Sequence, residues 1–506
     1  MPAVAGLSFV IVLFAPLDPL RIAVLSRWQP SIFFGGIPAL WGDFAAWPLA
    51  VGFSCAVLSS VLVQLGRLPQ PRFSLGLSVL GMLATGLGSI WSENLLMLLL
   101  CWAGFDLAWG LGAAAADLPA RRVTMGVGLG ALATVALWAG ALAVDARGGS
   151  LSWLLMDLSG PGRDLLWAAA ALRLGLYPLH MALPVERTEG PPGAASLMLG
   201  PVLGWALLLR LAEVGGSQLA VTSWAGWLAG ATFLAGGLLA WLRGGSGAGW
   251  PYASLAAAGG VLWASLVAGD AAAQVLAAGG ASWVLGVTLL HMSRGMERAA
   301  PWWSVAPIMG GLTLLGAPLT WGLVSTIYLL GSPVAPLTVG RAVVFLFAQG
   351  LLTAAVAHRV FRPAPTEEPI GPLHKAARAA GLILPAALLL IAGLRAVFRF
   401  PALGAPSLAG RLAWPGAVGF VLWLAGLALG GVLYDQERRG FRQRMEAMLG
   451  LLCDLFRLDW LWRLLLASQA RLVAFLSAVA DVMEGPGAIL WALAIFLLVL
   501  LMVTAH

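Results

Sequence analysis

The stretch that decides the fold runs from Arg173 to Arg210 and reads RLGLYPLHMALPVERTEGPPGAASLMLGPVLGWALLLR. Prolines interrupt this apolar stretch at five positions, Pro178, Pro184, Pro191, Pro192 and Pro201. Each proline removes a helical hydrogen bond, and at membrane depth the freed backbone is tolerated only where protein or a water-filled cavity satisfies it. The spacing fits two structures equally: a broken helix that lines an ion pathway, or two helices joined by a proline-rich interfacial loop.

The composition of the whole chain excludes a soluble protein. Of 506 residues, 60% are hydrophobic and 10% are charged, and the mean hydropathy is +0.91. A soluble domain carries about 25% charged residues, so lipid must solvate most of this chain. Soluble enzymes, nucleic-acid binders and disulfide scaffolds are thereby excluded. The three cysteines, Cys55, Cys101 and Cys453, lie far apart in apolar stretches and are read as small hydrophobic residues.

Apolar runs of membrane-spanning length recur along the chain. We therefore expect an all-α polytopic membrane protein with about 14–15 transmembrane helices. The first residues lack the basic region and cleavage site of a secretory signal, so we expect a first span over 5–25. The expected parts are a transmembrane core over 1–434, an amphipathic helix over 435–484 and a terminal transmembrane anchor over 485–506.

The amphipathic segment differs in kind from the spans. Its charges at Asp435, Arg439, Arg442 and Glu446 mark one polar face of a helix. A continuous helix over 440–483 would be about 65 Å long, roughly twice a bilayer core, so it cannot cross the membrane. We expect it to lie along the interface, either as a peripheral anchor or as a lateral strut against neighbouring subunits.

The distribution of basic residues predicts the orientation. Arginines concentrate in the loops after even-numbered spans, as at Arg67 and Arg72, and again in the cluster from Arg438 to Arg444. By the positive-inside rule we expect a multi-pass protein of the cytoplasmic (inner) membrane, with the basic tail in the cytoplasm. We place the N-terminus outside.

The stretch from Arg173 resembles the antiporter-like membrane subunits of respiratory complex I, membrane-bound hydrogenases and Mrp-type sodium/proton antiporters. The family pattern runs roughly K-x-x-x-x-P-x-H-x-W-L-P-D-A, then E-A-P-x-P-V-S-A-L-L-x-G, and ends in an Arg. The matching positions are Arg173 at the Lys, Pro178 and His180 at the P-x-H, Pro184 at the next Pro, and Pro191 in the second motif.

Four further segments are similar to family segments and follow in the family's order. They are GDFAAWPLAVGFS with Asp43, SENLLMLLLCWAGFDLAWGLG from Ser92, PYASLAAAGGVLWASLVAG from Pro251, and LLHMSRGMERAAPWWSVAPIMGGLTLLGAPLTWGLVS from Leu289, whose Gly316 and Pro318 fall in a second broken-helix motif. The resemblance covers about 40–361. It implies two broken helices, other membrane subunits as partners, protons or sodium ions as transported species, and a place in a proton-translocating complex of the NADH-quinone oxidoreductase or hydrogenase type.

The chain departs from the family at the positions that carry its proton relay. Its one lysine, Lys375, is expected in a loop, and Thr326 follows Ser325 where the family has a lysine in the second broken helix. Arg173 replaces another lysine and, with its high pKa, cannot release a proton. The eroded relay leaves two roles open: proton conduction by histidine and water, or a structural spacer between pumping neighbours.

Few ionisable residues lie inside the expected spans, and each is a candidate functional residue. His180 and His291 can carry protons along water or can serve packing. Asp106 is expected to form a buried ion pair with Arg173, and we place both residues with the two histidines on the expected proton pathway. Asp43 is expected as a helix-end cap or an interhelical contact, and Arg210 as a structural charge.

No catalytic motif is present, so we expect no bond-making chemistry, no metal and no cofactor in this chain; redox cofactors would belong to partner subunits. The alternative to a complex subunit is a stand-alone secondary transporter for an ion or small anion, with the anion bound by Arg173 and Arg210.

Overall fold

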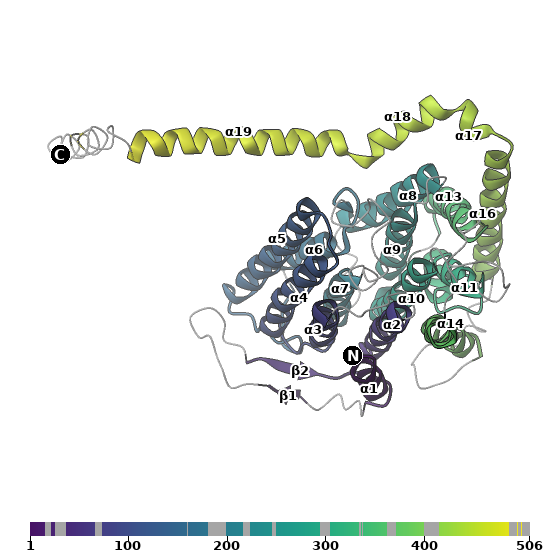
Figure 1. The fold of residues 1–506 in the computed structure, drawn as a ribbon, viewed down its shortest axis with the longest axis horizontal. Helices are drawn as coiled ribbons and strands as arrows, with labels where there is room; N and C mark the ends of the chain where they lie inside the picture. Colours follow the sequence, from purple (N-terminus) through teal and green to yellow (C-terminus); the bar gives the residue numbers. More distant parts are fainter. Residues whose placement is uncertain are drawn as a thin grey trace. The chain divides into compact units, whose positions relative to one another are not determined.

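A computed structural model shows a bundle of apolar α-helices, followed by a separate helical segment (Figure 1). It describes residues 1–15, 22–25, 37–65, 73–158, 160–180, 199–215, 223–244, 249–293, 304–332, 335, 337–361, 371–398, 414–484, 493 and 497. The chain divides into two compact units, Met1–Phe441 and Arg442–His506. The first unit ends a few residues after the expected boundary at 434, because the last helix of the bundle continues to Arg438.

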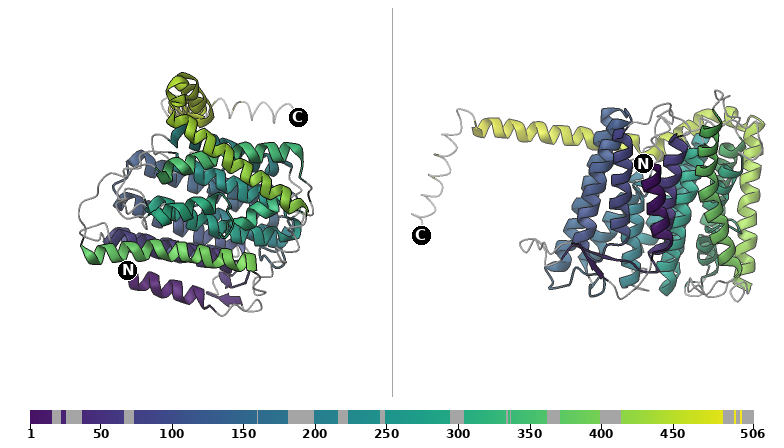
Figure 2. Two further views of the ribbon diagram at one scale, coloured as in Figure 1. Left: turned by 90° about the vertical axis from the view of Figure 1, so that its right-hand side faces the viewer. Right: turned by 60° about the horizontal axis from the view of Figure 1, so that its bottom comes forward.

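The helices of the first unit run side by side across the bundle (Figure 2). In chain order they are α1 (Pro2–Leu13), α2 (Trp47–Leu65), α3 (Phe73–Ile90), α4 (Leu95–Ala115), α5 (Ala120–Asp145), α6 (Pro161–Leu174), α7 (Val202–Gly215), α8 (Ser223–Gly244), α9 (Trp250–Val267), α10 (Ala272–Met292), α11 (Val305–Leu314), α12 (Leu323–Gly331), α13 (Val339–Phe361), α14 (Pro372–Phe398) and α16 (Trp414–Arg438). Within the described residues, nine helices are long and apolar enough to cross a membrane. The all-α polytopic fold is confirmed.

The centre of the bundle is formed by α10 and α2. The apolar window of α10 is 94% buried and that of α2 is 83% buried, against 33% for α5. Helices that are apolar on every face are suited to such a position. Their contact is close because Gly52 of α2 has no side chain: a Cβ there would lie 3.1 Å from the Cβ of Ala281 in α10.

A second close helix contact, between α8 and α9, makes a testable prediction. A Cβ on Gly259 would lie 2.5 Å from the backbone nitrogen of Phe233, and a Cβ on Gly236 would lie 2.6 Å from that of Ala256. Backbone cannot move aside as a side chain can, so Gly259→Leu should cost about 3 kcal/mol of stability. The measurement is thermal unfolding of the purified chain in detergent. Gly226→Leu in α8 is the matched control, since no atom lies within 4 Å of a Cβ there; equal losses in both variants would contradict the packing argument.

The expected first span over 5–25 is wrong. Helix α1 ends at Leu13, and β1 (Ile22–Val24) pairs antiparallel with β2 (Ala39–Trp41). The backbone of β2 continues into the segment before α4, where Trp41 N–H donates to Trp91 O at 2.7 Å and Glu93 N–H to Ala39 O at 3.1 Å. These extended residues join the ends of several helices at one side of the bundle.

The expected sidedness also needs correction. The Met1 side chain lies against Gly76 in the first turns of α3. Arg67 and Arg72 lie outside the described residues, in the stretch of sequence between the end of α2 at Leu65 and the start of α3 at Phe73. The N-terminus therefore lies at the end of the bundle where α3 begins. An external N-terminus and a cytoplasmic Arg67–Arg72 loop therefore exclude each other. The physical reason is that two helices, α1 and α2, separate the N-terminus from this stretch, so the chain crosses the bundle twice and returns to the same side.

The second broken helix is present. Helix α11 ends before Gly316, whose φ of +62° is left-handed, and α12 resumes at Leu323, so Gly316 and Pro318 both lie in the break. Helix α6 ends in the same way at Gly175, with φ +64°, just before Pro178. Left-handed residues at helix ends are most easily supplied by glycine. Pro184 and Pro191, in the continuation of this first broken helix, lie outside the described residues.

At the end of the first unit, the His358 ring of α13 lies in close contact with the Glu437 carboxylate of α16. The Tyr434 ring meets the His358 ring edge-on, with centroids 4.9 Å apart. Lys375, expected in a loop, lies instead in the first turn of α14 and is exposed. A proline at the first helical position suits a helix start, which extends α14 beyond the apolar run.

The second unit contains α17, which begins at Phe441 and ends at Arg444, then α18 (Glu446–Arg457) and α19 (Asp459–Glu484). The expected continuous helix over 440–483 is wrong, because Leu458 takes a left-handed φ of 59° between α18 and α19. With 26 residues, α19 is about 39 Å long. The expected terminal span lies outside the described residues apart from Leu493 and Leu497.

Candidate functional site

The expected pair of Asp106 and Arg173 is present between α4 and α6. Arg173 donates from Nη1 to Asp106 Oδ1 at 2.7 Å and from Nη2 to Asp106 Oδ2 at 2.9 Å. The Arg173 side chain is 8% exposed and that of Asp106 is 17% exposed. Two parallel bonds between a guanidinium and a carboxylate are the strongest geometry available to this pair. The pair thus neutralises both charges in an apolar bundle.

Three neighbours build the environment of this ion pair. The Arg173 guanidinium lies 4.6 Å from the ring centroid of the buried Trp102, a cation–π contact. Thr134 Oγ1 donates to Asp106 Oδ2 at 3.4 Å from α5. A Cβ on Gly130 would come within 2.8 Å of both charged groups, so the glycine gives α5 room to cover the pair. Three helices therefore hold the pair in one geometry.

A second charged cluster joins Arg210 of α7 to Asp43 and Glu213. Arg210 is 0% exposed, and its Nη1 bonds the Asp43 carboxylate and, at 2.7 Å, Glu213 Oε2. Its Nη2 donates to Ile90 O at 2.9 Å and Trp41 O at 3.3 Å. The single guanidinium thus ties α7 to the end of α3 and to β2.

Asp43 performs both functions that the sequence left open. Its Oδ1 accepts from Ala46 N–H at 2.6 Å, just before α2 begins, and its Oδ2 bonds Arg210. A carboxylate before a helix satisfies an otherwise unpaired N–H and interacts favourably with the helix dipole. Asp43 therefore starts α2 and carries the interhelical ion pair at the same time.

His180 is buried, at 2% exposure, between two tyrosines. The Tyr177 ring stacks on it with centroids 5.3 Å apart, and the Tyr252 ring from α9 lies 5.9 Å away. Tyr177 N–H donates to Thr232 Oγ1 of α8 at 3.2 Å. His180 thus lies where the break after α6 meets the following helix pair.

His291 lies in the last turn of α10 and is half-buried. The structure places it near the end of its helix, away from the helix middle. Arg294, which the resemblance aligns next to the family's lysine, lies outside the described residues. The four residues expected to form the proton pathway therefore divide into a bound ion pair, Asp106 with Arg173, and two histidines on other elements.

Sequence reasoning missed two acidic residues. Glu213 lies one helical turn from Arg210, and this i,i+3 spacing was the available signal. Glu93 accepts from Asn94 Nδ2 at 2.8 Å and bonds the Ser152 hydroxyl. It is 7% exposed and lies at the turn between α3 and α4. No spacing in the sequence links Glu93 to Ser152, so only the fold brings them together.

The buried charges around Arg173 and Arg210 are paired with one another and are not available to bind a ligand. Both buried arginines, Arg173 and Arg210, already bind carboxylates, and His180 packs between two tyrosine rings. Asp106 is held by Arg173 through two hydrogen bonds. The cluster around Arg210 joins three parts of the backbone and is built for stability.

Comparison with known proteins gives structural matches only. No family model matches the sequence, and no curated protein does. The Mrp complex from Dietzia sp. DQ12-45-1b matches with a TM-score of 0.78 at 19% identity, over 100% of this chain and 59% of that one. The membrane-bound sulfane sulfur reductase, an archaeal respiratory membrane complex, matches with 0.69 at 18% identity, over 99% and 95%. Respiratory complex I from Thermus thermophilus matches with 0.60 at 17% identity, over 85% and 94%.

The chain spans 59% of the length of the Mrp complex chain. It spans nearly the full length of the reductase and complex I chains. At these low identities the similarity is one of fold. The resemblance inferred from the five sequence segments is confirmed at that level: the chain has the fold of the antiporter-like membrane subunits.

Proposed function

We propose that the chain is an antiporter-like membrane subunit of a multi-subunit, proton-translocating complex of the NADH-quinone oxidoreductase or hydrogenase type. The observation that carries this proposal is the structural match over the whole chain to the Mrp complex, with similar matches to the sulfane sulfur reductase and complex I. The names of these neighbours describe membrane complexes, so the proposed partners are other membrane subunits. The proposed location is the cytoplasmic membrane, with the basic loops and the N-terminus both facing the cytoplasm.

The proposed proton handling rests on the groups that the structure holds within the bundle. The proposed proton carriers are Asp106, His180 and His291, and Arg173 positions Asp106. The lysines of the related relay are absent from the sequence. Water would have to carry protons between the remaining groups, so proton transfer would depend on each of them.

Replacement of His180 by Ala should reduce proton flux without disassembly of the complex. An imidazole can accept a proton at one ring nitrogen and donate one from the other, so its loss should slow proton transfer by about tenfold or more. The measurement is proton uptake by liposomes that contain the purified complex. His374→Ala is the matched control, because His374 is exposed at the start of α14. Unchanged flux in both His180→Ala and His291→Ala would favour the structural-spacer role.

Removal of the second unit should release neighbouring subunits. A chain ended after Phe441 keeps α16 and the His358–Glu437 contact, so it tests the second unit alone. Helices α18 and α19 carry apolar residues such as Leu451, Leu464 and Phe475 on exposed surface, which is suited to partner subunits or lipid. The readout is the subunit content of the purified complex. Retention of every neighbour would assign the unit a role other than assembly.

The alternative is a stand-alone secondary transporter for an ion or small anion. Its proposed anion ligands would be Arg173 and Arg210. Both guanidinium groups are engaged by carboxylates in this structure. A substrate anion would have to displace a carboxylate that is held by two bonds or buried, which disfavours this alternative.

A further inference from the structure

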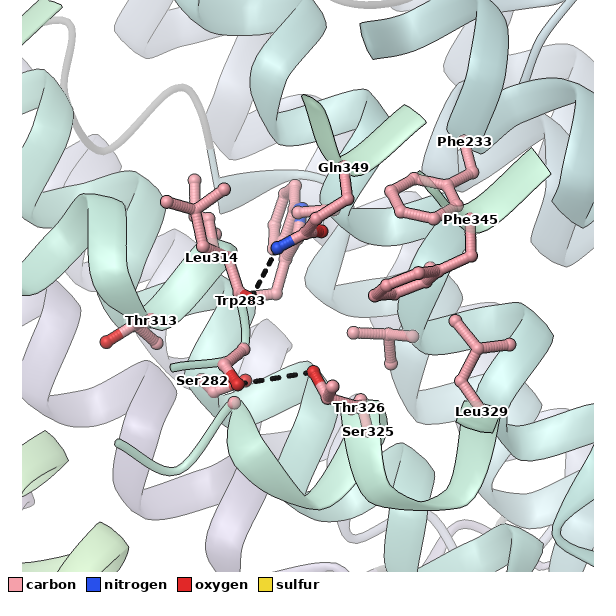
Figure 3. A pocket seen from close by; sticks show the side chains of 16 residues that line it. Phe233, Ser282, Trp283, Thr313, Leu314, Ser325, Thr326, Leu329, Phe345 and Gln349 are labelled. Carbon is pink, nitrogen blue, oxygen red and sulfur yellow. Dashed lines mark hydrogen bonds between the residues drawn. The ribbon is translucent and has the colours of Figure 1, made fainter. Parts of the chain in front are cut away.

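A cavity lies at the break between α11 and α12 (Figure 3). Its volume is about 30 Å³, and space for one water molecule requires about 10–15 Å³. Helices α8, α9, α10 and α13 complete its walls. In Figure 3 the rings of Phe233 and Phe345 lie on one side, with Ser325 and Thr326 on another. The cavity therefore has an apolar wall and a polar wall.

The polar wall carries hydroxyl and amide groups. Its side chains are Ser282, Thr313, Ser325, Thr326 and Gln349. Among the described residues that line the cavity, none has an ionisable side chain. Thr326 is the position at which the resembling family has a lysine. At this position the cavity is therefore lined by a polar, uncharged side chain, where the resembling family has a charged one.

The two helix ends at the break are satisfied within the protein. Leu315 O accepts from Gln349 Nε2 and from Trp423 Nε1, both at 2.8 Å. At the start of α12, Leu323 N–H donates to Thr320 O at 3.2 Å and Ser325 N–H to Gly322 O at 3.2 Å. A bare helix end would attract an ion through its partial charge. These bonds engage part of the free backbone groups at the break, which weakens that attraction and favours a neutral guest.

Ser325 supplies a polar group that lacks a partner. Its side chain lines the cavity and is 7% exposed. Its Oγ has no hydrogen-bond partner within the described part of the chain. The neighbouring Thr326 Oγ1 makes one long bond, 3.3 Å to Gly316 O. A buried hydroxyl without a partner costs about 1–3 kcal/mol, and a guest that both donates and accepts would recover this energy.

We infer that this cavity is a water-binding site, in which a neutral water bonded to Ser325 Oγ occupies the place of an ionisable side chain. Water fits the volume, the mixed donors and acceptors, and the absence of charge. This inference rests on the proposed function and deepens it, because it assigns a neutral polar group to the position where the resembling family carries a lysine. The binding itself does not depend on proton transport or on partner subunits.

Radiolytic labelling followed by mass spectrometry tests the inference on the purified full chain, with any subunits that accompany it. Hydroxyl radicals form from bound water, so Leu329 and Phe345 beside the cavity should be labelled at least about twofold more than the equally buried Leu208 and Phe105. The double variant Ser325→Ala/Thr326→Val should lose this excess. Ser54→Ala is the matched control, because its buried hydroxyl bonds Val51 O at 3.1 Å away from the cavity.

Two results would overturn the inference. Labelling of Leu329 and Phe345 no greater than that of Leu208 and Phe105 in the unmodified chain would show a dry cavity. A saturable rise in melting temperature with NaCl or KCl, absent with choline chloride at equal ionic strength and abolished by Thr326→Val, would show a cation site. Neither readout uses proton flux or subunit content, so failure here is distinguishable from failure of the proposed function.

Discussion

Replacement of Arg210 by Met should lower the free energy of unfolding by about 3–5 kcal/mol, because a fully buried charge pair loses one partner. The guanidinium is 0% exposed and is shared by Asp43 and Glu213. Its removal leaves two carboxylates close together in an apolar bundle, and it also frees the carbonyls of Ile90 and Trp41. The measurement is thermal unfolding of the purified chain, followed by tryptophan fluorescence.

Compensating substitutions distinguish the charge from the shape of Arg210. The triple variant Arg210→Met/Asp43→Asn/Glu213→Gln should recover much of the loss, because it removes the unpaired carboxylates. Arg439→Ala is the matched control: its pair with Asp435 has side chains 71% and 51% exposed, so its loss should be within about 1 kcal/mol. If the triple variant is no more stable than Arg210→Met, the account of this cluster as a charge pair is wrong.

Replacement of Asp106 by Leu should cost about 3 kcal/mol, because it leaves the Arg173 guanidinium without its carboxylate. The bidentate bonds at 2.7 and 2.9 Å would both be lost. The contact with Trp102 would remain, but a cation–π contact of about 2 kcal/mol in such a site does not replace the lost carboxylate. Unfolding of the purified variant measures the loss of stability, and reconstituted vesicles measure its proton flux.

The double variant Asp106→Leu/Arg173→Met separates structure from function at this pair. Apolar replacement of a whole buried ion pair is often neutral for stability, so the double variant should fold about as well as the unmodified chain. The proposed proton handling predicts that it nevertheless loses flux, since the carboxylate is gone. Full flux in the stable double variant would reduce Asp106 and Arg173 to a structural pair.

Several contacts could be predicted because intramembrane charges are scarce. Asp106 lies inside an expected span, where its carboxylate could neutralise Arg173, and the structure brings the two together. Asp43 precedes a helix, and its two open readings both prove correct. The break at Gly316 and Pro318 follows from the motif and from the chemistry of glycine and proline.

Other features were beyond local reasoning. Leu458 adopts a left-handed conformation with neither glycine nor proline to signal it, so the interruption of the amphipathic segment had no sequence mark. The contact between His358 and Glu437 depends on the packing of α13 against α16. The end of α1 had a signal that the interpretation passed over: Pro16 and Pro19 follow it closely, and residues before proline disfavour helix.

The orphaned hydroxyl of Ser325 illustrates a further limit. Its sequence neighbours, including the replaced lysine position at Thr326, indicate that the relay has changed. Only the fold shows that Ser325 faces a cavity, at the break between α11 and α12, that α8, α9, α10 and α13 enclose. The threonine at position 326 shows from the sequence that a lysine is absent, whereas only the packing of the helices shows that a cavity lies beside it.

Gentle purification of the chain from its native membrane, with identification of the accompanying proteins by mass spectrometry, tests the central claim most directly. The account predicts that further membrane subunits and iron–sulfur or quinone-reducing subunits come with it. A chain that emerges alone from mild detergent would contradict the claim and favour the stand-alone transporter.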